Sequence, residues 1–117
     1  MDKRKIGSFF EEMACEYLVE RGYSILDRNF HAGRIGEIDI VARLGNAVIF
    51  IEVKGRRSLA FGTPAEAISA TKLRKIKLTS TFYLSQKHIE FSDIKFLVVE
   101  ILQNVDEYDI NVIEDIF

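Results

Sequence analysis

The stretch from Gly36 to Lys54 constrains the fold more than any other part of the chain, because it holds two apolar runs around one short turn. Gly45 and Asn46 separate the runs, and a two-residue loop of this kind is typical of a tight β-hairpin. With these two residues as the loop, Leu44 faces Ala47 and the same register sets every deeper pair. We therefore expect two antiparallel strands.

Charged side chains interrupt both apolar runs, and the hairpin register decides which of them meet. It predicts Asp39 opposite Glu52 and Glu37 opposite Lys54. Glu37 is either a surface partner of Lys54 or a carboxylate that contacts the ligands of a site without binding the cation itself. The first pair brings two like charges to a Cβ separation of about 5 Å, so that one carboxyl is protonated or a cation bridges them. Oxygen-only ligands are preferred by Mg²⁺, Mn²⁺ and Ca²⁺.

Length and composition indicate one globular domain spanning residues 1–117, with 48% apolar residues and a single proline. The lone Cys15 excludes an internal disulfide and a multi-cysteine zinc site. Glu11 and Glu12 interrupt any hydrophobic signal region, and no apolar run approaches the ~20 residues of a membrane span. A soluble, cytoplasmic protein without a membrane partner is expected.

Further helices and strands are predicted on both sides of the hairpin. The predicted elements are a helix over 7–21, strands over 23–30, 36–44 and 47–54, a helix from 63 to about 86, and strands over 94–102 and 108–117. The second helix is expected to begin at an N-cap Thr63, with Pro64 at the first helical position and Glu66 three residues after the cap. The order α-β-β-β-α-β-β predicts an α/β fold in which helices flank a mixed sheet.

Glu11 differs from the other glutamates of the first predicted helix. An apolar face with helical spacing comprises Phe10, Met13, Ala14, Tyr17 and Leu18. Glu11 lies at the margin of this face, whereas Glu12, Glu16 and Glu20 form the opposite, solvated stripe. A carboxylate at that margin either snorkels to solvent or is aimed at a site, and the pattern favours neither.

The net charge of −2 is unevenly distributed along the chain. Residues 54–78 contain seven basic residues and one acidic residue, a local charge of +6, whereas residues 90–117 carry −7. A local basic stretch decides whether phosphate can dock. This predicts that Arg56, Lys72 and Lys75 lie on a nucleic-acid side, although a solvated helix and loop surface is an equal alternative.

Asp39, thirteen residues before Glu52, and Lys54, two residues after it, fit the D…ExK arrangement of metal-dependent nucleases. Two carboxylates can hold a divalent cation, which polarises a phosphodiester and acidifies a bound water. Residues two apart on a strand share a face, so Lys54 is expected beside Glu52. There it could orient the attacking water or stabilise charge developing on phosphate.

Five ordered motifs resemble the YraN-like family of small bacterial proteins over roughly residues 7–101. They are GSFFEEMACEYL, GYSILDRNFH, GEIDIVAR, VIFIEVKGRR and FGTPAEAISATKLRKI. That family is similar to Holliday junction resolvases and to the PD-(D/E)xK restriction-endonuclease-like fold. The resemblance implies a central mixed sheet flanked by helices and a nuclease site that uses Mg²⁺ or Mn²⁺. It also makes a homodimer plausible, since related resolvases pair their active sites.

The same resemblance assigns roles to individual residues. It implies that Asp39 and Glu52 are metal ligands, with the Val53 carbonyl as a further ligand, and that Lys54 is the catalytic base or stabiliser. Its helical Gly-x-x-x-Glu pattern selects Glu11 as a catalytic carboxylate. Glu37 matches the glutamate of the family's Gly-Glu-Ile-Asp segment. Arg56 follows the family's ExK segment, and Lys72 matches the lysine of its second helix. Phe10 departs from the pattern, since many relatives have a small residue there, and this bears on the packing beside Glu11.

The sequence thus predicts a metal-dependent endonuclease acting on nucleic acid, with DNA favoured. Two alternatives remain: a binding module of the same fold that does not cleave, and a protein-interaction domain that uses the acidic C-terminal strand. His31 and His88 are interpreted as surface residues because neither lies in a ligand or triad pattern. No nucleophile-elbow or P-loop pattern occurs in the sequence.

Overall fold

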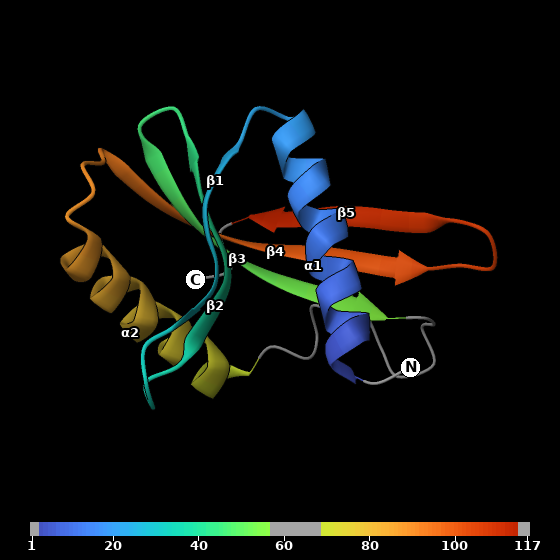
Figure 1. Ribbon diagram of the computed structural model, residues 1–117, viewed down its shortest axis with the longest axis horizontal. Helices are drawn as coiled ribbons and strands as arrows, with labels where there is room; N and C mark the ends of the chain where they lie inside the picture. Colours follow the sequence, from blue (N-terminus) through green and yellow to red (C-terminus); the bar gives the residue numbers. More distant parts are fainter. Residues whose placement is uncertain (1–2, 57–68, 115–117) are drawn as a thin grey trace.

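The computed structural model describes residues 3–56 and 69–114, which form a five-stranded sheet and two helices (Figure 1). The elements are α1 (Lys3–Glu20), β1 (Ser24–His31), β2 (Glu37–Leu44), β3 (Ala47–Arg56), α2 (Ala70–Lys87), β4 (Asp93–Gln103) and β5 (Tyr108–Glu114). The strands follow one another across the sheet in chain order. Only the β3–β4 pair is parallel among these strands. This confirms the predicted α/β layout.

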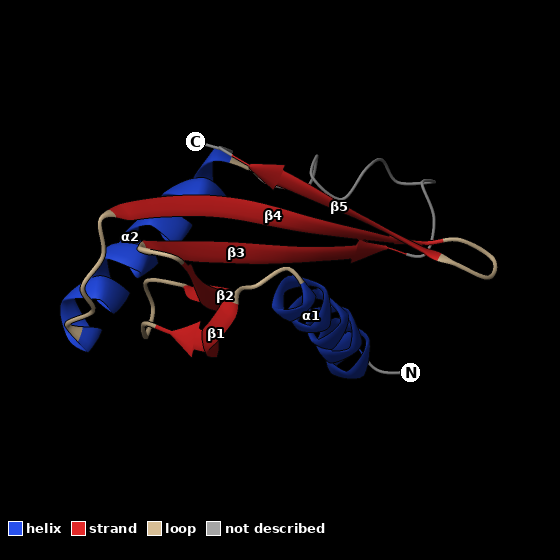
Figure 2. Cartoon of the chain, turned by 90° about the horizontal axis from the view of Figure 1, so that it is seen from above, coloured by secondary structure: helices blue, strands red, loops and turns tan. Residues whose placement is uncertain are grey.

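The two helices cover opposite faces of the sheet. On one face, Phe10, Ala14 and Leu18 of α1 are buried with Ile40 and Ile51 of the hairpin. On the other face, the alternate residues of β3 and two residues of β2 pack on α2. The buried residues of this second cluster are Ile38, Val41, Val48, Phe50, Ile76 and Tyr83. In Figure 2, strands β3 and β4 pass in front of α2. Because β3 is covered on both sides, its apolar run is nearly continuous, as expected of a buried parallel strand.

The β2–β3 hairpin has the predicted two-residue loop. Leu44 pairs with Ala47, and Gly45 has φ of +61°, a value that glycine adopts without steric cost. The predicted register holds as far as the pair Ile40–Ile51. Beyond that pair the two strands cease to be partners in the ladder, with consequences for the site described below.

Both helices begin at different residues from those predicted. Helix α1 starts at Lys3 and ends as expected before Gly22, which has φ of +91°. There the amide of Tyr23 donates to the Leu18 carbonyl, and the Gly22 amide donates to the Val19 carbonyl, so the last carbonyls of the helix are satisfied.

The second described helix, α2, begins at Ala70. Helix α2 begins after Ser69, whose extended backbone and hydroxyl, which accepts a hydrogen bond from the Lys72 amide, make it the N-cap. Thr63, Pro64 and Glu66 lie outside the described residues.

Candidate metal and phosphate site

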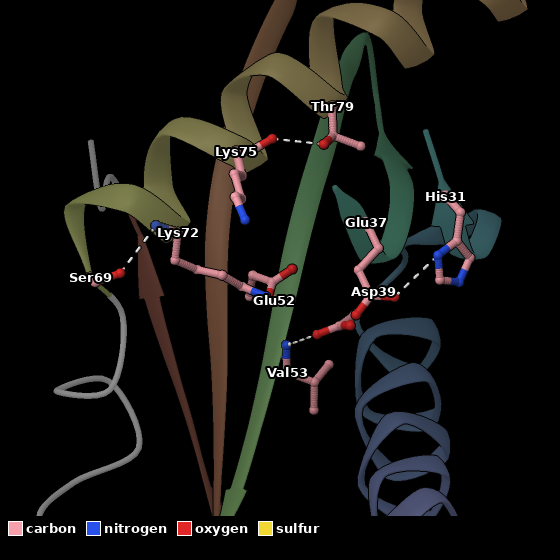
Figure 3. A network of polar contacts seen from close by, with 9 residues as sticks. All are labelled: His31, Glu37, Asp39, Glu52, Val53, Ser69, Lys72, Lys75 and Thr79. Atoms are coloured by element: carbon pink, nitrogen blue, oxygen red, sulfur yellow. Dashed lines mark hydrogen bonds and ion pairs between the residues drawn. The ribbon is translucent and has the colours of Figure 1, made fainter. Parts of the chain in front are cut away.

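Carboxylates from different elements converge at the place where β2 leaves β3 (Figure 3). Glu52 and Asp39 come from these two strands, and Lys72 comes from the first turn of α2. Glu11 comes from α1, and its charge interacts with that of Asp39. The structure thus brings together three carboxylates that are 13 to 41 residues apart in sequence.

Asp39 does not face Glu52 across a regular ladder. Its Oδ2 atom instead accepts a hydrogen bond of 2.9 Å from the backbone amide of Val53, the residue after Glu52. The predicted pairs Asp39–Glu52 and Glu37–Lys54 are therefore corrected, since the side chain of Asp39 takes the position of a backbone acceptor at the point where the ladder ends. Glu37 lies opposite His31 of β1, and its Oε2 is 3.3 Å from His31 Nδ1.

Glu52 is the most deeply buried charged group of the site, with 2% of its surface exposed. Its Oε2 is 3.5 Å from Lys72 Nζ, whereas its Oε1 has no hydrogen-bond partner among the described residues. Burial, and then the charge of Asp39, raise the pKa of Glu52 to about 7, although Lys72 and Lys54 act in the opposite direction. A buried carboxylate oxygen without a partner is costly and calls for a donor or a cation.

The pKa values of Asp39 and Glu11 are also raised. Burial raises the pKa of Asp39, while the hydrogen bond from Val53 and the charge of Lys72 lower it. The pKa of Glu11 is raised by burial and by the charge of Asp39, and the polar Asn29 side chain and the charge of Arg28 oppose the increase. The charge of Asp39 thus reaches Glu11, and the role of Glu11 in the site stays a prediction.

The Lys54 side chain extends from the same face of β3 as Glu52, because alternate residues of a strand share a face. Its charge interacts with both Asp39 and Glu52. Lys54 thus lies within electrostatic range of both carboxylates, and its part in catalysis stays a prediction. Val53, between the two, points to the α1 side, where it packs against that core cluster.

The oxygen ligands suit a hard divalent cation. Within residues 3–56 and 69–114, no group of three or more acidic, histidine or cysteine side chains is arranged to hold a metal. Two carboxylates with one unsatisfied buried oxygen can hold a cation that keeps part of its water shell, as Mg²⁺ commonly does. Asp39 and Glu52 therefore fit such a cation, and a contribution from the Val53 carbonyl stays a prediction.

The predicted phosphate-binding residues occupy different positions around this cluster. Lys72 is within the cluster, as its contact with Glu52 shows. Lys75 lies one turn further along α2 and is exposed, and its side chain points toward the Glu52 side in Figure 3. Arg56 is partly exposed at the end of β3, two residues beyond Lys54.

Two residues of β1, His31 and Asn29, were not assigned to the site from the sequence. His31 is exposed, as predicted, but its pairing with Glu37 depends on the β1–β2 register. Asn29 has φ of +52° within β1. The tolerance of asparagine for this conformation is a weak signal, and no local pattern predicts a left-handed residue within a strand.

The fold and this cluster define the class: an α/β protein with a carboxylate–lysine cluster at the point where its central hairpin opens. The chain belongs to the uncharacterised protein family UPF0102, whose model matches residues 10–101. It is 44% identical to a UPF0102 protein of Caldicellulosiruptor saccharolyticus over the whole of both chains. It is 42% identical to one of Alkaliphilus oremlandii, covering 97% of this chain and 98% of the relative. These matches confirm the family resemblance drawn from the five motifs.

Among the described residues, no helix is long and apolar enough to cross a bilayer.

Proposed function

We propose that this protein is an endonuclease that depends on Mg²⁺ or Mn²⁺ and hydrolyses phosphodiester bonds of nucleic acid, with DNA as the favoured substrate. The proposal depends chiefly on the buried Glu52 carboxylate, whose Oε1 has no partner among the described residues although Asp39 and Lys72 lie close by. The family's resemblance to resolvases and restriction-endonuclease-like proteins supports the same chemistry.

Each residue of the cluster has a task in this proposal. Asp39 and Glu52 would hold the cation, which supplies Lewis-acid polarisation of phosphate and a more acidic water. The Val53 amide fixes the orientation of the Asp39 carboxylate through its 2.9 Å hydrogen bond. Glu11 adds negative charge beside Asp39 and can accept a proton, because its pKa is raised. Lys54 and Lys72 neutralise the carboxylates and present ammonium groups to phosphate.

Lys54 separates cleavage from binding in this proposal. An ammonium group does not ligate a cation, so Lys54→Met is expected to retain the rise in melting temperature that Mn²⁺ causes. Loss of charge stabilisation in the transition state should lower single-turnover cleavage by about 10²–10³-fold, with a modest loss of DNA affinity. Glu52→Gln serves as the metal-deficient variant. Lys87→Met is the matched lysine control, since Lys87 lies at the far end of α2 near Asp27.

The measurement is single-turnover cleavage beside equilibrium binding on linear, flapped and four-way DNA. Equal cleavage by the wild type and Lys54→Met would remove the catalytic role of this lysine. A wild type that binds Mn²⁺ and DNA but cuts no substrate would contradict the nuclease proposal.

The second candidate is a binding module of the same fold that does not cleave. One observation favours it: Lys72 Nζ lies 3.5 Å from Glu52 Oε2 and supplies a charge partner without any cation. Under this alternative, Mn²⁺ leaves the melting temperature of the wild type unchanged while DNA still binds. The metal titration therefore distinguishes the two.

A further inference from the structure

The loop between β1 and β2, residues 32–36, lies against helix α2 (Figure 1). Within the loop, the Ala32 amide donates to the Gly36 carbonyl and the Ile35 amide donates to the Ala32 carbonyl, each at 2.9 Å. Ala32 is buried, whereas Arg34 is exposed in the middle of the loop. The two hydrogen bonds close the loop on itself, so that Arg34 is carried by a backbone of defined shape.

Gly36 is the residue at which this loop meets the helix. A Cβ added at Gly36 would lie 2.8 Å from Thr79 Oγ1 and 3.5 Å from Lys75 Cβ. Thr79 is fully buried, and its hydroxyl donates to the Lys75 carbonyl at 2.7 Å, so the hydroxyl is held in place. The loop can therefore approach α2 this closely only because position 36 has no side chain.

This contact joins Arg34 to the basic helix. Arg34 is two residues from Gly36, so their Cα atoms are at most about 7 Å apart. Lys75 is the helix residue on which Gly36 packs, and Lys72, one turn earlier, reaches the carboxylate cluster. Arg34 thus adds a positive charge from the sheet to the positive charges at the start of α2.

Arg34 differs from other arginines of the sheet and helices in its lack of a partner within the protein. Arg21 and Arg43 donate to backbone carbonyls, and Arg28 donates to the Glu12 carboxylate. Within residues 3–56 and 69–114, the guanidinium of Arg34 has no ion pair and no hydrogen bond. The loop therefore holds an arginine whose five donors are available to a ligand.

We propose that Arg34 binds a backbone phosphate of DNA, and that the packing of Gly36 on α2 places it there. The β1–β2 loop and the start of α2 would then form one phosphate-binding rim beside the carboxylate cluster. This inference rests on the proposed nucleic-acid function and adds to it a residue outside the basic segment 54–78. A guanidinium suits this task because it can donate two hydrogen bonds to one phosphate.

The first test measures equilibrium binding of a linear DNA duplex in EDTA over a range of salt concentrations. Arg34→Gln should lower the slope of log K against log salt by about one, because one phosphate contact is lost. Arg21→Gln is the matched control, since Arg21 is an exposed arginine that follows α1 and donates to the Tyr17 carbonyl. Its slope should equal that of the wild type.

The second test displaces Arg34 without removing its charge. Gly36→Ala places a methyl group on the Thr79 hydroxyl, so the loop should move away from α2 and the slope should again fall by about one. Gly36→Ala/Arg34→Gln should show no further fall. Thr79→Ala removes the hydroxyl and should restore part of the slope to Gly36→Ala. The restoration is partial because alanine is strained at the Gly36 φ of +158°.

The outcomes separate this inference from the proposed function, since none of them depends on cleavage. A wild-type slope in Arg34→Gln, or an equal fall in Arg21→Gln, refutes the phosphate contact alone. A wild-type slope in Gly36→Ala, or a further fall in the double variant, refutes the part of the proposal that concerns the packed loop. A wild type that binds no duplex DNA refutes the nucleic-acid proposal and this inference with it.

Discussion

At the scale of the residue, Glu52 combines features that seldom occur together in a protein interior. It is almost fully buried, one of its oxygens has no partner among the described residues, and a second carboxylate lies close by. Such an arrangement destabilises the protein unless a proton or a cation neutralises the charge. Lys72 compensates for part of this cost from α2. The residue therefore links the stability of the fold to whatever occupies the site.

The pH dependence of stability should expose this link in the metal-free protein. The pKa of Glu52 is raised from 4.5 to about 7 by burial and Asp39, so the folded state favours the protonated acid. The resulting stabilisation is complete below pH 4.5 and is lost as the pH rises through 7. The wild type should lose up to about 3 kcal/mol relative to Glu52→Gln over this range.

Urea unfolding in EDTA between pH 4.5 and pH 8 measures this difference. Parallel stability curves for the wild type and Glu52→Gln would contradict the prediction. Saturating Mn²⁺ should stabilise the wild type more at pH 8 than at pH 5, because the ligands must be deprotonated to bind it.

At the scale of the element, the close approach of α1 to β3 holds Glu11 near the site. Gly55 lies in β3 directly under Phe10 of α1, and a Cβ added at Gly55 would overlap the Phe10 ring. The Phe10 side chain is buried in the same cluster as Ala14 and Leu18. The departure from the family pattern at Phe10 is thus accommodated by a glycine on the facing strand, and Glu11 is the next residue along the helix.

Gly55→Ala should therefore destabilise the protein by about 1–3 kcal/mol through overpacking. In a Phe10→Ala background, which removes the ring, the same substitution should cost much less. Thermal unfolding of the two single variants and the double variant provides the comparison. Additive losses would mean that the ring and the glycine are not in the contact described above.

At the scale of the whole molecule, a basic helix and an acidic turn lie far apart (Figure 1). Helix α2 contains five basic residues and no acidic one. The turn between β4 and β5 projects at the opposite end of the molecule from α2 (Figure 1), and Asp106, Glu107 and Asp109 lie at this turn. A polyanion is attracted by the first region and repelled by the second, so the nucleic-acid footprint is expected near α2 and the end of β3.

The salt dependence of DNA binding tests this footprint. Each lost phosphate contact lowers the slope of log K against log salt by about one, because fewer counterions are released. The double variant Arg56→Gln/Lys75→Gln should thus show a slope lower by about two, with weaker binding to all DNA sequences.

Lys95→Gln is the matched control for this measurement. Lys95 is an exposed lysine of β4 that pairs with Ile49, a residue whose side chain lies on the α1 side of the sheet. Removal of its charge should leave the slope unchanged. If the control lowered the slope as much as the double variant, the footprint would lie on another face.

Local patterns accounted for much of the fold. The Gly45-Asn46 turn determined the hairpin register, the apolar spacing of α1 identified its buried face, and Gly22 predicted where that helix ends. These features depend on residues within a few positions of one another, where steric limits and periodicity operate directly. The hairpin register and the D…ExK spacing selected Asp39, Glu52 and Lys54, whereas the family resemblance selected Glu11; the charges of these residues interact in the fold.

What only the tertiary structure decided concerns contacts between segments that are distant in sequence. Three features depend on how the strands and a helix pack together. They are the end of the β2–β3 ladder, the hydrogen bond from Val53 to Asp39 and the left-handed backbone of Asn29. A register predicted from the turn assumes that regular pairing continues along both strands. It cannot anticipate where a side chain replaces a backbone acceptor. The burial of Glu52 and the approach of Lys72 likewise require the crossover that places α2 over β3, because burial is a property of the assembled core.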